Sequence, residues 1–257
     1  MKKTLLNLAI IGALAAASNI ALADSDNLKS ANSNCKGLPS HTDLKRTLTD
    51  ARLQSNGGFN LDMLGTVVDR DGIVCAVAFT GNDRGAQWPG SRVISAQKAN
   101  TANSFSLPGL ALSTANLYSA VQPGGSLFGL QESNPVDTAA AYKGPSKNYG
   151  QANDPLVGNK IGGVNVFGGG LALYDANKKL IGAIGVSGDS SCADHNIAWR
   201  TREGLSLDNI PGGVGPNGTD GIVYTVGDGW AHPVCSAAAK AIAITIGAGG
   251  DATPPAP

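Results

Sequence analysis

The sequence predicts a single α+β domain, because one unit, a β-hairpin followed by a helix, occurs twice along the chain. The first unit has two β-branched-rich runs at 64–68 and 73–79, and the Asp71-Gly72 pair between them is typical of a tight hairpin turn. The second unit has runs at 171–174 and 180–186 with a polar turn between them. In both units a stretch with helical spacing of apolar residues follows. Two such units around one sheet favour one α+β domain over two separate domains.

The elements of the first half follow from local signals. A first helix is predicted at 41–55, and Ser40 is suited to cap its start. The run 73–79 is almost wholly apolar, which predicts a strand in the interior of the sheet with both faces covered. After Pro89, a broad apolar face made mostly of small side chains predicts a helix that reaches Phe105 and lies close against the sheet.

The second half begins with a long irregular stretch. Segment 106–160 is rich in Gly, Pro, Ser and Asn, which predicts an insertion with one short helix at 110–117. Helical spacing returns at 192–203. Residues 235–246 fit a closing helix or strand, and 247–257 is expected to fray as a disordered tail.

Composition excludes several classes of protein. The chain has 257 residues, of which 42% are apolar and only 15% charged, so it is not an intrinsically disordered chain. Lys and Arg number 19, as do Asp and Glu, so there is no basic field to gather phosphates. Nucleic acid is therefore not expected as a partner.

The N-terminus has the pattern of a secretory signal peptide. Lys2 and Lys3 precede an apolar stretch at 5–17, and Ala21-Leu22-Ala23 fits the small-residue cleavage rule. The apolar stretch is shorter than a membrane-spanning helix requires. We therefore expect a bacterial protein that loses residues 1–23, begins with a flexible lead-in at 24–38, and works in the periplasm or is secreted.

Four cysteines, Cys35, Cys75, Cys192 and Cys235, would meet an oxidising compartment after export. Two disulfides are expected, and four cysteines allow three connectivities. Pairing Cys35 with Cys75 and Cys192 with Cys235 is favoured, because each bond would staple one end of the chain to its centre. A metal site is less favoured, since no pair has the C-x2-C spacing.

Four motifs follow the pattern of one known family. They are Val67-Val68-Asp69 with Asp71-Gly72, the segment KANTANSF at 98–105, GGVNV at 162–166, and LIGAIGVSG at 180–188 followed by Asp194. In these forms and this order they resemble the GlcG/HbpS-like haem-binding, or haem-degrading, family. The resemblance covers roughly 40–105 and 160–205, and Asn165 stands where the family commonly has proline.

The resemblance implies a fold and a ligand. The fold is a GlcG/HbpS-like domain at 39–246 that carries the insertion 106–160, a profilin-like α/β sandwich in which helices flank an antiparallel sheet. The resemblance also implies a homo-oligomer, binding of haem or a related tetrapyrrole, and a membrane sensor as partner. Cys192-Ala193-Asp194-His195 is not the C-x-x-C-H attachment motif, so the haem is expected to be non-covalent.

Haem iron takes an axial donor, and with the cysteines paired the histidines are the leading candidates. His195 is the first candidate for the metal ligand, because it follows the strand motif and the neighbouring Asp194 carboxylate would orient its ring. His41 is the second, since it lies at a helix start that favours a neutral imidazole. His232 lies outside the resemblance and ranks last. The competing interpretation is a surface histidine in the first turn of a helix for His195 and a helix-start residue for His41, and it is favoured over ligation at both positions.

Lys98 and Thr101 are expected to complete the cofactor-binding pocket. They are three residues apart and share one helix face, where an ammonium and a hydroxyl group would meet a haem propionate. A solvated helix face is the competing interpretation of the same spacing.

The sequence therefore predicts an exported haem-binding protein for haem storage, scavenging or sensing, with no catalytic residue assigned. The alternative is an enzyme on the same scaffold, acting by oxidative haem degradation or as a serine hydrolase through Ser187. The second chemistry is disfavoured because Asp189 replaces the last glycine of the G-x-S-x-G pattern. A third interpretation is an adaptor module whose segment 106–160 makes an oligomer contact.

Overall fold

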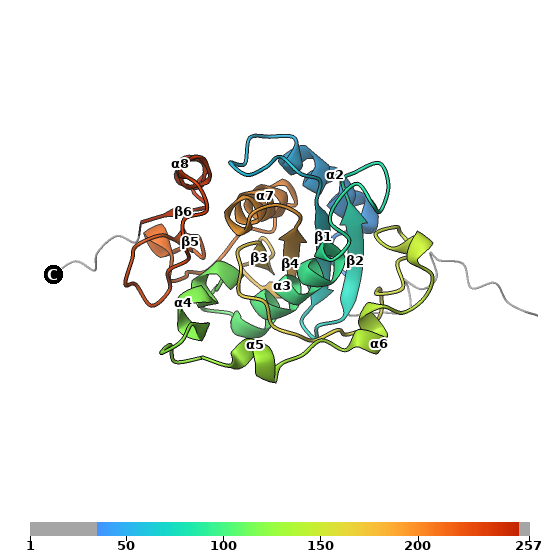
Figure 1. Cartoon of the computed structure of the whole chain (residues 1–257), viewed down its shortest axis with the longest axis horizontal. Coiled ribbons are helices and arrows are strands. Elements are labelled where there is room, and N and C mark those ends of the chain that lie inside the picture. Colours follow the sequence, from blue (N-terminus) through green and yellow to red (C-terminus); the bar gives the residue numbers. More distant parts are fainter. Residues whose placement is uncertain (1–34, 252–257) are drawn as a thin grey trace, which may run out of the picture.

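The computed structural model describes residues 35–251, and its centre is a four-stranded antiparallel sheet in the order β2-β1-β4-β3 (Figure 1). The strands are β1 (Leu64–Asp69), β2 (Val74–Phe79), β3 (Gly170–Tyr174) and β4 (Leu180–Ser187). Both predicted hairpins are confirmed, because β1 pairs with β2 and β3 pairs with β4. The pairing of β1 with β4 joins the two hairpins into one sheet.

Helices cover both faces of this sheet (Figure 1). α3 (Ser91–Phe105) lies on one face, while α2 (His41–Arg52) and α7 (Ser191–Gly204) lie together on the other. Ser40 caps α2 as predicted, since its Oγ accepts a hydrogen bond from the Asp43 backbone N–H. The expected α+β domain with an antiparallel sheet flanked by helices is confirmed.

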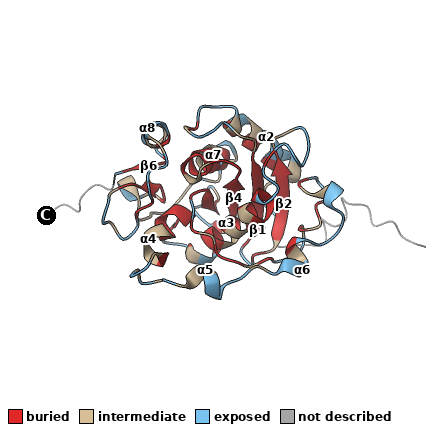
Figure 2. Ribbon diagram, viewed as in Figure 1, coloured by how far each residue is buried: buried red, intermediate tan, exposed pale blue. Residues whose placement is uncertain are grey.

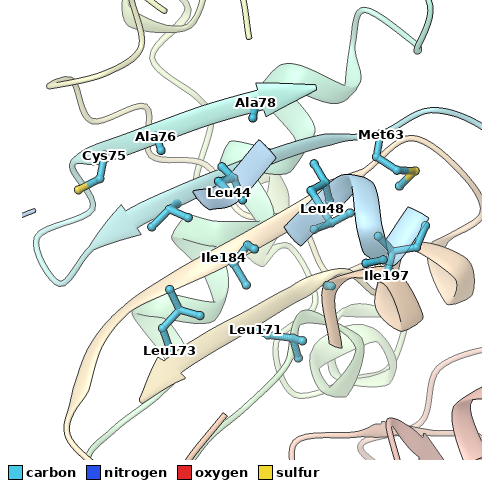
Figure 3. Close-up of a cluster of buried hydrophobic side chains, with 14 residues drawn as sticks. Leu44, Leu48, Met63, Cys75, Ala76, Ala78, Leu171, Leu173, Ile184 and Ile197 are labelled. Carbon is cyan, nitrogen blue, oxygen red and sulfur yellow. The ribbon is translucent and has the colours of Figure 1, made fainter. Parts of the chain in front are cut away.

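Two apolar clusters hold the layers together. The cluster under α2 and α7 consists mainly of large aliphatic side chains, among them Leu44, Leu48, Met63, Leu171, Leu173, Ile184 and Ile197 (Figure 3). The cluster under α3 combines strand residues with small helix residues, among them Val68, Val77, Phe79, Ala96, Ala99 and Ala102. Burying one large aliphatic side chain contributes roughly 1.5–3 kcal/mol, so these clusters are the main source of stability.

The glycines of the β4 motif let α3 lie against the sheet backbone. A Cβ atom at Gly185 would overlap the carbonyl oxygen of Ser95 on α3. Ala96 and Ala99 on the facing side of α3 are fully buried and equally small. The expectation that small residues bring this helix close to the sheet is confirmed.

The position predicted for 73–79 in the sheet interior is wrong, because β2 is an edge strand. Its six residues are buried, which explains its apolar composition. The free edge is covered by the insertion: the Val74 backbone N–H donates to the Asn159 carbonyl, and the Gly158 N–H donates to the Val74 carbonyl, both at 2.9 Å. An apolar strand sequence reports burial of its faces and does not report its place in the sheet.

The insertion 106–160 is more ordered than its composition suggests. Its helical segments are η2 (Thr114–Leu117), α4 (Tyr118–Val121), α5 (Leu130–Ser133), α6 (Thr138–Ala141) and η3 (Ser146–Asn148). α5 and α6 lie on the outside of the molecule (Figure 2). The insertion is anchored by a buried ion pair between Asp154 and Arg92 of α3. The short helix expected at 110–117 starts only at residue 114 and continues through α4.

The C-terminal segment packs at the end of the molecule opposite α6 (Figure 1). It contains η4 (Pro216–Gly218), β5 (Ile222–Val223), α8 (Ala237–Thr245) and β6 (Gly249–Gly250), and β5 pairs with β6 in parallel. The closing element at 235–246 is therefore a helix. The expected fraying of 247–257 is wrong for 248–250, which are buried.

Both favoured disulfides are present, Cys35–Cys75 and Cys192–Cys235. The first ties the segment before α2 to β2, and the second ties α7 to the segment before α8. The predicted signal peptide at 1–23, most of the lead-in at 24–38 and residues 252–257 lie outside the described residues. Between residues 35 and 251, no helix has the length and apolar character that a membrane crossing requires.

Candidate functional site

A cleft of ≈ 390 Å³ opens where α3, β4 and α7 meet. Its lining comes from four parts of the chain that the fold brings together: Trp88, Gly90, Ser91, Ile94 and Lys98 at α3; Asn165 and Phe167 before β3; Ser187 at the end of β4; and Asp189, Ser191 and Asp194 at the start of α7. These parts include three of the four motifs noted in the sequence, so the cleft is the candidate functional site.

The walls of the cleft are apolar and exposed. Trp88 is 55% exposed and Phe167 45% exposed. Ile94, on α3, lines the same cleft. Exposed aromatic side chains grouped around a concavity favour contact with a ligand that has a large apolar face.

The floor of the cleft contains a buried ion pair. Lys98 Nζ donates to Asp194 Oδ2 at 2.7 Å and to the Val186 carbonyl at 3.1 Å, and both charged side chains are almost fully buried. Burial raises the pKa of Asp194 to about 6, although the Lys98 ammonium opposes this shift. Lys98 thus lines the cleft, with its ammonium bonded to the Asp194 carboxylate and to the Val186 carbonyl.

Ser187 is the nucleophile of the alternative serine-hydrolase hypothesis, and its hydroxyl group contacts another serine hydroxyl. Its Oγ donates to Ser91 Oγ at 3.2 Å and is 5% exposed as a residue. Asp189 is engaged elsewhere, because its carboxylate accepts backbone N–H groups of Phe59 and Leu61. Among residues 35–251 no imidazole contacts Ser187, so the base that would activate a serine nucleophile is missing.

Thr101 and His41 do not line the cleft. Thr101 is fully buried; its Oγ1 donates to the Gln97 carbonyl at 2.8 Å and accepts the Asn165 backbone N–H at 3.0 Å. Since Asn165 lines the cleft, Thr101 positions the cleft wall. His41 Nε2 lies 3.1 Å from the Gly150 carbonyl, where α2 meets the insertion.

His195, the first candidate for the metal ligand, lies behind the wall of the cleft. It is fully buried, and its Nε2 atom donates to the Ala248 carbonyl at 2.9 Å, while Nδ1 has no hydrogen-bond partner. Burial lowers the pKa of His195 to about 4, so the ring is neutral at pH 7. The expected orientation of this ring by Asp194 is wrong, because the Asp194 carboxylate bonds Lys98 and the Asp189 backbone N–H.

His232, ranked last by the sequence, lies near the same wall. Its Nε2 accepts the Gly168 backbone N–H at 3.4 Å, next to the cleft residue Phe167. Its ring contacts Tyr118 at 5.1 Å between centroids, and Tyr118 in turn contacts Phe167. Burial lowers the pKa of His232 to about 4. Two neutral imidazoles therefore flank Gly168 behind the cleft, and neither lines it.

Two other clefts lie beside α2, with volumes of ≈ 370 and ≈ 530 Å³. The first has a mixed lining that includes Arg52, Asn56 and Ile197, and the second has a lining with several charged side chains, Arg46 and Arg200 among them. Neither contains a residue that the sequence singled out for binding, so the cleft at α3 remains the candidate.

The fold is an α+β domain with helices on both sides of an antiparallel sheet, and it carries a cleft with apolar walls. A family model described as haem degrading protein HbpS-like matches residues 44–203, more than half of the chain. The chain belongs to this HbpS-like family, and the predicted resemblance is confirmed.

Two solved structures are similar to this chain. The Klebsiella pneumoniae protein ORFY, of the DUF336 family, is 25% identical with a TM-score of 0.43, and the match covers 65% of this chain and 90% of that one. A PduOC:heme complex is 24% identical with a TM-score of 0.45, and the match covers 67% of this chain and 98% of that one. A comparison with curated proteins found no match.

The family raises the question of whether the cleft fits haem. Its apolar walls suit the porphyrin faces, and Lys98 on its floor suits a propionate. An axial bond to iron is not provided: within the described chain, which contains all three histidines, no histidine, cysteine, methionine or tyrosine lines the cleft. The residues present fit the macrocycle and its carboxylates and do not fit coordination of the iron.

Sequence reasoning found Lys98 and missed the walls. Trp88 and Phe167 lie in glycine-rich connections, where no helical or strand periodicity marks a functional side chain. A usable signal was present, because Trp88 is followed by Pro89-Gly90 and Phe167 by three glycines, an unusual place for large aromatic residues in a chain with 5% aromatics.

Proposed function

We propose that this protein binds haem or a related tetrapyrrole in the cleft between α3, β4 and α7. The observation that carries the proposal is the pairing of exposed apolar walls, Trp88 and Phe167, with a buried cation, Lys98, on the floor. A tetrapyrrole has the matching chemistry, a flat apolar ring with carboxylates at one edge. Membership of the HbpS-like family supports the same ligand.

Each part of the cleft has a separate task. Trp88, Ile94 and Phe167 exclude water from the ring faces, and the two aromatic side chains add stacking worth about 0.5–1.5 kcal/mol each. Lys98 attracts a ligand carboxylate in competition with Asp194. Haem, when bound, supplies a redox-active iron and a visible chromophore.

Because no axial ligand lines the cleft, the binding free energy of haem would come from contacts with the porphyrin ring and its carboxylates. Iron-free protoporphyrin IX should therefore bind nearly as well as haemin. The role of His195 as axial ligand stays a prediction, and it requires Gly168 and the adjoining segment to move, since His195 packs directly behind Gly168.

The biological setting is also proposed. The signal-peptide pattern supports export to the periplasm or beyond, where the protein would serve haem storage, scavenging or sensing. Homo-oligomers and a membrane sensor partner remain proposals from the family resemblance. N-terminal sequencing of the protein from the producing cells tests export, because cleavage after Ala23 is expected and an intact Met1 would contradict it.

Haemin titration of a cleft-filling variant tests the binding site. Gly90 lines the cleft, and a Cβ atom built there meets no atom within 4 Å, so Gly90→Trp places a large ring in the cleft without a clash at its base. We expect a saturable Soret shift with the unmodified chain and at least a tenfold weaker one with Gly90→Trp. Gly109, beyond the far end of α3, has equally free space, and Gly109→Trp is the matched control. Equal binding by all three proteins would reject this site.

A further inference from the structure

A cluster of sulfur and nitrogen atoms lies at the start of α7, behind the wall of the cleft. It consists of the sulfurs of Cys192 and Cys235 and a ring nitrogen of His232, and all three atoms lie within 4.8 Å of one another. We propose that Cys192, Cys235 and His232 form a Zn²⁺ site that opens when a dithiol reduces the disulfide between the two cysteines. Thiolate sulfur and imidazole nitrogen are the ligands that Zn²⁺ prefers in proteins.

Apart from the two bonded sulfurs, the donor atoms are nearly as far apart as the ligand atoms of a tetrahedral zinc site. The usual Zn–S and Zn–N bond lengths place neighbouring ligand atoms roughly 3.3–3.8 Å apart. Cys192 Sγ lies 4.0 Å from His232 Nδ1. The Pro233 carbonyl oxygen, a candidate for the fourth position, lies 3.5 Å from Cys192 Sγ and 2.8 Å from His232 Nδ1. The main movement required is separation of the two bonded sulfurs.

The backbone around the sulfurs favours thiolates. The Cys192 N–H donates to Cys235 Sγ, and the Cys235 N–H donates to Cys192 Sγ, both at 3.2 Å. Cys192 also lies in the first turn of α7, and helix N-termini lower the pKa of a cysteine thiol. On the imidazole, Nδ1–H donates to the Pro233 carbonyl and Nε2 accepts from Gly168. Ligation through Nδ1 therefore moves one proton from Nδ1 to Nε2 and breaks the 3.4 Å hydrogen bond from Gly168.

The difference in solvent exposure between the two cysteines decides which sulfur the reductant attacks. Cys235 is exposed and Cys192 is buried, so a dithiol attacks Cys235 Sγ and the electron pair of the S–S bond leaves on Cys192. The second thiol of the reductant then displaces Cys235, and the reductant ends as a disulfide. Two electrons and two protons pass to the protein, and Zn²⁺ releases two protons when it binds both sulfurs.

The sequence carries a signal for this site that the search for C-x2-C spacing does not detect. His232 and Cys235 are separated by two residues, as paired ligands on one loop often are. Cys192 is 43 residues away from Cys235 and reaches the loop only through the fold.

Co²⁺ is the probe for the test, because its tetrahedral thiolate complexes have intense visible and charge-transfer absorption. The full exported chain is titrated with Co²⁺ before and after reduction by a phosphine, which does not itself supply thiol ligands. We expect no such bands in the oxidised protein and one bound Co²⁺ in the reduced protein, displaced by Zn²⁺. His232→Asn should weaken Co²⁺ binding at least tenfold, while His41→Asn should leave it unchanged.

A Cys35→Ser/Cys75→Ser variant removes the other disulfide, which lies beside Asp69 in a second cluster of donor atoms. Retention of the bands in this variant is expected, and their loss would move the site to that cluster. The proposal is overturned if the reduced wild-type chain shows no bands, or if His232→Asn gives the same bands and affinity. It is also overturned if reduction abolishes the far-UV circular dichroism of the wild-type chain, since binding would then reflect unfolded thiols.

Discussion

Lys98 Nζ lies 2.7 Å from Asp194 Oδ2, and this single contact joins α3 to α7 across the end of β4. Both side chains come from motifs that lie nearly a hundred residues apart in the chain. The pair closes the floor of the cleft, so its charges affect stability and ligand binding together.

Removal of the lysine should destabilise the protein in a pH-dependent way. Lys98→Met leaves the Asp194 carboxylate buried without its partner, and loss of one member of a buried pair typically costs about 3–5 kcal/mol. Because the pKa of Asp194 is already raised to about 6, the carboxyl is mostly protonated at pH 5 and the loss there should be smaller than at pH 8. Urea unfolding at both pH values measures this difference. An equal loss at pH 5 and pH 8 would contradict the raised pKa.

Stability should fall as the pH is lowered through the range from 6.5 to 4, and His195 is one cause. Its pKa is about 4 in the folded chain against 6.5 ordinarily, so the unfolded state binds more protons in this range. The share of His195 is up to about 3 kcal/mol. Asp194 acts in the opposite sense, because its raised pKa makes the folded state bind the extra proton. The variant His195→Gln should show a shallower decline in unfolding free energy with acid, and an unchanged slope would sink this assignment.

The anchor of the insertion should be sensitive to a single substitution. Asp154→Ala leaves the Arg92 guanidinium buried without its carboxylate, so we expect a loss of about 3–5 kcal/mol and faster proteolysis within the insertion. Asp50→Ala is the control, because its pair with Arg46 is more than 60% exposed in both side chains and should contribute little. Limited proteolysis and thermal melting compare the two variants. Similar behaviour of both would show that the insertion is held by other contacts.

Gly185→Ala should separate α3 from the sheet. The added Cβ would overlap the Ser95 carbonyl, so α3 has to move away from β4. Overpacking of this kind typically lowers the free energy of unfolding by about 1–3 kcal/mol. Gly109→Ala adds the same atom in open space and should leave the melting temperature unchanged. If the two variants melt alike, the close approach of α3 to β4 is not as the structure has it.

Much of the fold was predictable from the sequence because its signals are local. The hairpins follow from Asp71-Gly72 and from two β-branched runs, and the helix at Ser91–Phe105 follows from small apolar residues at helical spacing. The edge position of β2 was not predictable, because its covering segment at 158–160 comes from a distant, aperiodic insertion. The burial of 248–250 was missed for the same reason, since pairing with β5 is a long-range contact.

Some residues of the candidate site were predictable from the sequence and others were not. Lys98 was predicted because it opens the helix motif KANTANSF at 98–105. The disulfides were predicted because each links one end of the chain to its centre. The partner of Asp194 was misassigned, since proximity in sequence to His195 suggested an imidazole while the fold supplies Lys98 from another helix. Trp88 and Phe167 were missed because the wall they form exists only after the chain has folded.

Parallel titrations of residues 24–257 with haemin and with iron-free protoporphyrin IX test the central claim most directly. The cleft offers apolar walls and a cation but no axial ligand, so both compounds should bind saturably at one site with dissociation constants within about tenfold of each other, or 1.4 kcal/mol. Absence of saturable binding of either compound would contradict the proposed function. Tight binding of haemin with none of protoporphyrin would contradict the assignment of affinity to the macrocycle and would return His195 to the role of axial ligand.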